Sequence, residues 1–197
     1  MPIAFSAIID RKQKTCIDFS LFSYSVLSAS SAVNKKNIIH NSNKLAKYMF
    51  FEFEADFVEA LRCIPMQVRL KLDTCGIKLK LQDWNHFNQA ERQMLVEKPC
   101  LTPAEIIDYR EKLNQVLIQQ TGKPGTDLTV DENPPWIDAA TVPESVSAKA
   151  QELGVTITLG QWASLQPLQR FALIKLSRSS HENKNFIPAL QEFKVIE

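Results

Sequence analysis

The spacing of apolar residues predicts short helices over most of the chain after its first quarter. Two helix-compatible stretches begin at Pro65 and Pro143, and they end at Gly76 and Gly154. Proline suits the first turn of a helix because that position has no intrahelical N–H bond to lose, and glycine suits the left-handed residue after the last turn. Each stretch is therefore predicted to be a helix bounded by its proline and its glycine.

A capping box predicts a further helix in the middle of the chain. Thr102 precedes Pro103 and is followed by Glu105, so the two polar side chains can satisfy free N–H groups of a helix start. We expect this helix to end at Gly122 and an irregular linker to follow over residues 123–140. Earlier in the chain, the pattern between Phe50 and Leu61 fits either a strand or a helix, and it favours a helix from about Ala55.

An internal repeat relates two parts of the chain. Residues 63–96 align with residues 141–174 at a constant offset of 78 residues and without gaps. The identical pairs include Pro65 with Pro143, Gly76 with Gly154, Trp84 with Trp162, and Arg92 with Arg170. We therefore predict an all-α fold, a compact bundle of short helices built from two related helical units that bury their tryptophans together. The recurring arginines are interpreted as structural, either capping helix carbonyls or pairing with acids.

The first 48 residues show a different pattern. They are rich in Ser, Asn and Lys and show no sustained helical or strand period. We predict a disordered extension over residues 1–48 and a single helical domain over residues 49–197. Met49 directly precedes the patterned region, so it remains open whether residues 1–48 belong to the mature protein. A stretch near the N-terminus loosely resembles a secretory signal, but Asp18 and several serines interrupt it.

Composition excludes several classes of protein. A formal net charge of +1 gives no long-range positive field of the kind that nucleic-acid binders use. With 5 glycines and no glycine-rich phosphate-loop motif, a nucleotide site of that type is not expected. No apolar run approaches the ~20 residues that cross a bilayer. The cysteines are far apart, as in a cytoplasmic protein with reduced thiols, and no motif of a known catalytic constellation occurs, so we expect no enzyme.

Four long strings of residues carry a family resemblance. They are residues 51–57 (FEFEADF), 61–65 (LRCIP), 72–79 (LDTCGIKL), and the segments between residues 159 and 186. Together they resemble the nitrate reductase associated protein family, over about residues 50–193. The resemblance implies a protein of cyanobacterial type, encoded alongside nitrate reductase and molybdenum-cofactor genes and needed for an active assimilatory nitrate reductase. It implies no catalytic residues.

The densest polar cluster follows a strongly apolar helix near the C-terminus. It contains Arg178, His181, Glu182, Asn183 and Asn185. Such side chains at a helix end suit a phosphate, a pterin or the carboxylate of a partner. The alternative is a capped loop that joins two helices, with asparagine side chains bonding their own backbone. We predict that these five residues bind a partner.

Cys63, Cys75, Cys100 and His86 are weak candidates for a metal site. Thiolate and imidazole are suitable ligands, but the spacings match no compact ligand pattern. In the repeat, Cys63 and Cys75 align with a threonine and a leucine, which favours small buried side chains. We therefore predict no metal and no cofactor.

These observations favour a non-catalytic accessory protein required for assembly or activation of assimilatory nitrate reductase. It would bind the enzyme or its cofactor-insertion machinery and act through different affinities for two states of its client. One alternative is a metal- or cofactor-binding delivery protein, and a less favoured one is a DNA-binding regulator built on helix-turn-helix units. We expect no membrane or nucleic-acid partner, and the sequence leaves the client surface and the oligomeric state open.

Overall fold

The computed structural model describes residues 50–178 and 184–197, and helices make up most of this part of the chain. The predicted helical class is therefore confirmed. Within the described residues, no helix is both long enough and apolar enough to span a membrane. The extension predicted over residues 1–48 lies outside the described residues.

The described region begins with two short elements and a longer helix. The 3-10 turn η2 spans Glu52–Glu54 and helix α2 spans Ala55–Val58, so a helix begins at Ala55 as predicted. Helix α3 spans Met66–Cys75, with Pro65 at its N-cap. Gly76 ends α3 at a φ of +70°, which confirms the predicted left-handed stop.

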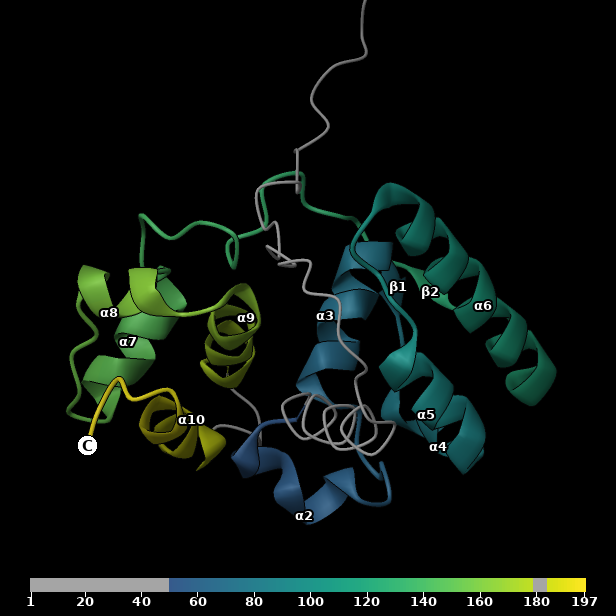
Figure 1. Cartoon of the computed structure of the whole chain (residues 1–197), viewed down its shortest axis with the longest axis horizontal. Coiled ribbons are helices and arrows are strands. Elements are labelled where there is room, and N and C mark those ends of the chain that lie inside the picture. The colour runs from purple at the N-terminus through teal and green to yellow at the C-terminus, as the bar shows by residue number, and fades with distance from the viewer. Residues whose placement is uncertain (1–49, 179–183) are drawn as a thin grey trace, which may run out of the picture. The chain divides into compact units, whose positions relative to one another are not determined.

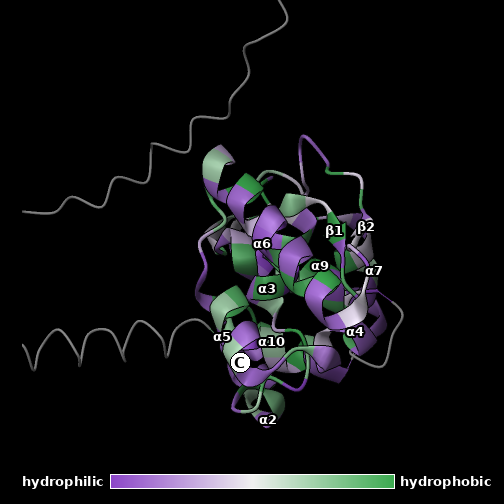
Figure 2. Cartoon of the chain, turned by 90° about the vertical axis from the view of Figure 1, so that its right-hand side faces the viewer, coloured by the Kyte–Doolittle hydropathy of each residue, from purple (hydrophilic) through white to green (hydrophobic). Residues whose placement is uncertain are grey.

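A strand and three helices follow in sequence order. They are β1 (Ile77–Lys78), α4 (Leu81–His86), α5 (Gln89–Glu97) and α6 (Pro103–Thr121). The hydroxyl of Thr102 accepts a hydrogen bond from the N–H of Glu105, so the predicted capping box is present, and α6 ends at Gly122. Figure 2 shows hydrophobic and hydrophilic residues alternating along α6, as expected for a helix with one face in the core.

The predicted irregular linker contains one regular element. Residues Thr126–Asp127 form strand β2, which pairs with β1 in an antiparallel ladder. The N–H of Leu128 donates to the carbonyl of Gly76 at 2.9 Å, and the N–H of Gly125 donates to the Asn114 side chain at 2.9 Å. These are contacts between segments far apart in sequence. A strand of two residues shows no alternation of its own, so the sequence did not predict it.

Four further helices complete the described chain. They are α7 (Glu144–Glu152), α8 (Leu159–Ser164), α9 (Pro167–Leu176) and α10 (Phe186–Glu192). The side chain of Thr158 accepts the N–H of Gln161 and caps α8, and Pro167 lies in the first turn of α9. Gly154 lies after α7 at a φ of +74°.

The buried apolar side chains form two clusters, and α3 contributes to both. Val68 and Leu72 belong to the first cluster, whereas Met66 belongs to the second. Accordingly, α3 packs against α6 and against α9, and it lies between them in Figure 1. The first cluster is built mainly from α3 to α6, and the second from α7 to α10.

The two tryptophans that the repeat aligns lie in different clusters. Trp84 is in the first cluster and Trp162 is in the second, so the expectation that they are buried together is wrong. Each indole fills its own cluster and donates its Nε1–H to a nearby carbonyl. The acceptor is Leu61 O at 2.8 Å for Trp84 and Asp138 O at 3.0 Å for Trp162. The N–H group of each indole therefore has its hydrogen-bond acceptor in its own surroundings, without contact between the two rings.

The helix bounds keep the offset of the predicted repeat. Helices α3 and α7, α4 and α8, and α5 and α9 each begin 78 residues apart. Arg92 donates to Leu61 O at 3.1 Å and Arg170 donates to Trp136 O at 2.8 Å, so both arginines serve backbone carbonyls. The two segments also differ, because residues 77–78 form β1 whereas residues 155–156 are irregular. The relation between the two units stays a prediction.

Candidate functional site

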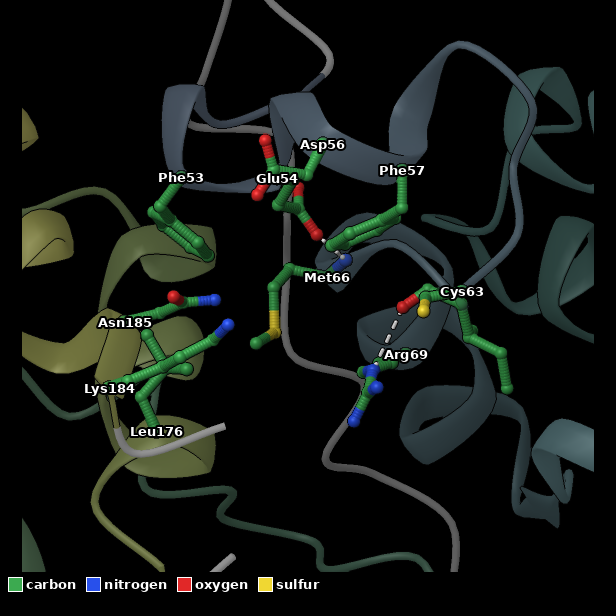
Figure 3. Close-up of a pocket in the computed structure, with 11 residues that line it drawn as sticks. Phe53, Glu54, Asp56, Phe57, Cys63, Met66, Arg69, Leu176, Lys184 and Asn185 are labelled. Carbon is green, nitrogen blue, oxygen red and sulfur yellow. Dashed lines mark hydrogen bonds between the residues drawn. The ribbon is translucent and has the colours of Figure 1, made fainter. Parts of the chain in front are cut away.

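A cavity of about 200 Å³ lies beside the first turn of α3 (Figure 3). Residues from η2, α2 and α3 line one side, and residues from the end of α9 and the start of α10 line the other. The apolar lining comes from Phe53, Phe57, Ile64, Met66 and Leu176, and the polar lining comes from Glu54, Asp56, Arg69, Lys184 and Asn185. An apolar hollow with a few convergent polar groups is the usual form of a binding site.

Glu54 is the buried acid of this cavity, with only 2% of its surface exposed. Its Oε1 accepts the N–H of Met66 at 2.8 Å, and its Oε2 accepts the N–H of Phe51 at 3.2 Å. Met66 is the first residue of α3, so the carboxyl caps this helix from another element. Burial raises the pKa of Glu54 to about 7, although the two N–H donors and Arg69 oppose that rise.

Cationic side chains lie on both sides of the same cavity. The Nε of Arg69 donates to the carbonyl of Ile64 at 2.9 Å, which fixes the guanidinium beside the start of α3. On the other side, Lys184 and Asn185 point toward the Met66 side chain in Figure 3. The cavity is thus lined by cationic groups on two sides and by two carboxyl groups, the buried Glu54 and the exposed Asp56.

A second cavity, of about 480 Å³, lies farther along α3. Its floor is aliphatic and is formed by Leu72, Ile77, Leu79, Leu81 and Leu128, with Ile64 at one end. Its charged lining comprises Arg69, Asp73, Lys78, Lys175 and Arg178. Lys175 Nζ forms a salt bridge to Asp73 Oδ2 at 2.6 Å across the gap between α9 and α3. Both side chains are largely buried, with relative exposures of 18% and 21%, so this pair holds the two helices in register.

The two cavities adjoin each other. Cys63, Ile64 and Arg69 line both of them. We call the two cavities together the α3 groove. This groove combines aliphatic and aromatic floor residues with charged edges, which suits recognition of another molecule more than it suits acid–base chemistry.

The structure places two of the five predicted partner-binding residues in the α3 groove. Arg178 lines the second cavity and Asn185 lines the first. Arg178 is exposed and Asn185 is half-buried at the N-terminal end of α10. His181, Glu182 and Asn183 lie outside the described residues. Partner binding by this cluster therefore stays a prediction.

The predicted weak metal ligands are spread over different surroundings. Cys75 and Cys100 are buried in the first cluster, and burial raises the pKa of their thiols to about 11 and about 12. A thiol with a raised pKa is a poor ligand because the thiolate is the form that binds metal. Cys63 lines the α3 groove, and His86 is exposed at the end of α4. Among the described residues, no three His, Cys, Asp or Glu side chains are grouped to hold a metal ion.

The family of the chain follows from comparison with known proteins. A model of a family described as conserved nitrate reductase-associated protein matches residues 50–193. The chain belongs to this family. No curated protein and no solved structure matches the chain. The resemblance inferred from the sequence strings is therefore confirmed, with the same boundaries.

Every residue that lines the α3 groove falls within the match to the nitrate reductase-associated family. Sequence reasoning missed the most buried charged residue among them, Glu54. Glu54 belongs to the string of alternating aromatic and acidic residues at the start of the family match. That string predicts a strand or a helix start, but it does not indicate which of its acids is buried. It also missed the Asp73–Lys175 bridge, because nothing local in the sequence relates two residues on different helices.

Proposed function

We propose that this member of the nitrate reductase-associated family is a non-catalytic accessory protein of assimilatory nitrate reductase. It binds the enzyme, or the machinery that inserts the molybdenum cofactor, and thereby promotes assembly of the active form. The observation that carries the proposal is the family match, which covers residues 50–193. It begins at residue 50, the first described residue, so the described region corresponds to the family's own module.

The α3 groove supports a binding role for this module. Its aliphatic floor and cationic edges have the composition of a protein-contact surface, which joins an apolar centre to a polar rim. An accessory protein of this kind works by preferring one state of its client. If it binds the cofactor-free enzyme more tightly than the loaded enzyme, it holds the acceptor state until loading and then dissociates.

The proposal includes a cytoplasmic location. Cys63, Cys75 and Cys100 are free thiols in the described part of the chain, which is usual for proteins of a reducing compartment. Buried free cysteines such as Cys75 and Cys100 behave as small apolar side chains and need no partner.

The test is a pull-down of purified nitrate reductase by the immobilised full chain. The reductase is supplied in two forms, cofactor-free and cofactor-loaded. We expect retention of the cofactor-free form at least tenfold above the loaded form. Adding the chain during cofactor loading should raise the yield of active reductase, and the gain should level off once the chain saturates the cofactor-free reductase.

Two results would contradict the proposal. One is the absence of retention for both forms of the reductase. The other is an unchanged yield of active reductase when the chain is present in molar excess during cofactor loading.

A further inference from the structure

The second cavity of the α3 groove concentrates positive charge. Four cationic side chains and one acidic side chain line it, whereas the whole chain carries a formal net charge of only +1. Lys175 is held in place by Asp73 and lies over the Phe171 ring, with Nζ 5.1 Å from the ring centroid. Lys78 is exposed at the end of β1. The Nε–H of Arg69 donates to Ile64 O at 2.9 Å, which holds this guanidinium beside the cavity, and Arg178 also interacts within the chain.

The aliphatic floor of this cavity continues onto the surface. Leu81 and Leu128 line it and are 45% and 37% exposed, and Val130, two residues after Leu128, is 50% exposed. Apolar side chains at this level of exposure beside a hollow mark a surface that another molecule covers. Because the apolar surface extends past the cavity, its occupant is longer than a small anion.

The shape and chemistry of the lining favour a peptide over a nucleic acid. A single-stranded nucleic acid would need aromatic rings on which its bases stack. The side chains of the described residues that line this cavity are aliphatic, charged or thiol, without an aromatic ring. An aliphatic floor accepts leucine-like side chains, and the lysine and arginine groups accept carboxylates.

We propose that the second cavity of the α3 groove binds an acidic segment of the protein partner, with leucine-like side chains on the floor and carboxylates beside Lys78 and Arg178. This inference rests on the proposed function and specifies the surface that the client presents. Its volume of about 480 Å³ holds a few side chains of such a segment.

The first experiment needs no reductase. The isotope-labelled full chain is titrated with a seven-residue peptide of glutamate and leucine, and the backbone amide signals are followed by NMR. We expect the largest shifts at Lys78, Leu79 and Leu128. A peptide with glutamine in place of glutamate should bind at least tenfold more weakly, because it lacks the carboxylates that the lysine and arginine side chains of the cavity attract.

Variants of matched charge test the site. Lys78→Glu should weaken binding of the acidic peptide by about tenfold or more, and raising the salt concentration should reduce this difference. Lys123→Glu makes the same change in net charge at an exposed loop residue outside the groove, and it should alter binding less than twofold. Equal binding of the two peptides, equal effects of the two variants, or the same shifts with inorganic phosphate alone would overturn the inference.

The same variants in the reductase pull-down separate this inference from the proposed function. If the wild-type chain retains the reductase and Lys78→Glu does not, both stand. If Lys78→Glu retains the reductase as well as Lys123→Glu does, the groove assignment is wrong and the accessory function stands. If the acidic peptide binds but the wild-type chain retains no reductase, the accessory function is wrong and the peptide site stands.

Discussion

At the scale of single residues, Glu54 shows how a buried carboxyl can be structural. Its two oxygens accept backbone N–H groups from Met66 and Phe51, which would otherwise lack a partner at the start of α3 and of η2. The same burial that makes these hydrogen bonds valuable also disfavours the charged carboxylate. The balance between the two effects sets a pKa of about 7.

This pKa predicts a fall in stability as the pH rises toward neutrality. The folded-state pKa of Glu54 lies above its ordinary value of 4.5, so the folded state holds the proton more tightly than the unfolded state. The resulting stabilisation is complete below pH 4.5 and is lost as the pH rises through about 7. Between pH 5 and pH 8 we expect Glu54 to account for a loss of about 2 kcal/mol in the free energy of unfolding.

Urea unfolding of the wild type and of Glu54→Gln at both pH values measures this contribution. Glutamine keeps an oxygen for the Met66 N–H and cannot ionise, so the variant should lose about 2 kcal/mol less stability than the wild type over this range. Glu192 also has a raised pKa, because of its burial, and it is present in both proteins, so its contribution cancels. Parallel pH dependence in the two proteins would show that Glu54 does not titrate in this range.

At the scale of elements, Gly76 joins the end of α3 to the β1–β2 ladder. It has a left-handed φ of +70°, and a Cβ built there would lie 2.8 Å from Val130 Cγ2 and 2.9 Å from the Leu128 carbonyl oxygen. Gly154 ends α7 with nearly the same φ, +74°, but a Cβ there would meet no atom within 4 Å. The two glycines therefore separate backbone strain from crowding.

Alanine at these two glycines should have different costs. Gly154→Ala should destabilise by about 1 kcal/mol, from the left-handed backbone alone. Gly76→Ala should destabilise by about 3 kcal/mol, because the added methyl group also displaces the segment that carries β2. Thermal unfolding followed by circular dichroism measures both. Equal losses of stability in the two variants would mean that the β2 segment moves away from the added methyl group without destabilising the fold.

The elements of this fold differ in how far the sequence predicts them. The helix start at Thr102 and the helix stops at Gly122 and Gly154 depend on signals within a few residues, so the capping box and the left-handed glycines could be predicted directly. Strand β2 and the α3 groove depend on which segments meet in space. The groove is lined by Glu54 of η2 at its first cavity and by the Asp73–Lys175 pair of α3 and α9 at its second, and no local pattern encodes this arrangement.

At the scale of the whole described molecule, α3 couples two apolar cores. The first core contains Phe87 beside Trp84, with ring centroids 5.9 Å apart. The second contains Phe193, whose ring meets those of Phe51 and Phe53 at centroid distances of 4.9 Å and 6.3 Å. Glu192 adds a further link, since its carboxyl oxygens accept the N–H groups of Glu52 and Phe53 at 2.8 and 3.3 Å. The second core thus ties α10 to η2, the first element of the described chain.

This arrangement predicts that a substitution in one core opens mainly the helices of that core. It also predicts that a substitution in either core affects α3. Phe193→Ala and Phe87→Ala should each destabilise by about 3 kcal/mol, since each removes a buried ring. In native-state hydrogen exchange, Phe193→Ala should speed exchange in η2 and α10 together, although they are distant in sequence, and Phe87→Ala should speed exchange in α4 and α5.

Because α3 packs into both cores, its backbone amides should exchange faster in both variants. Each variant should still unfold in one transition, with the same midpoint by circular dichroism and by tryptophan fluorescence. The fluorescence comparison is informative because Trp84 reports on one core and Trp162 on the other. Two separate transitions would mean that the cores fold independently. In that case the α3 groove, which needs α3 and α9 held together, would open whenever the second core does, even while the first core stays folded.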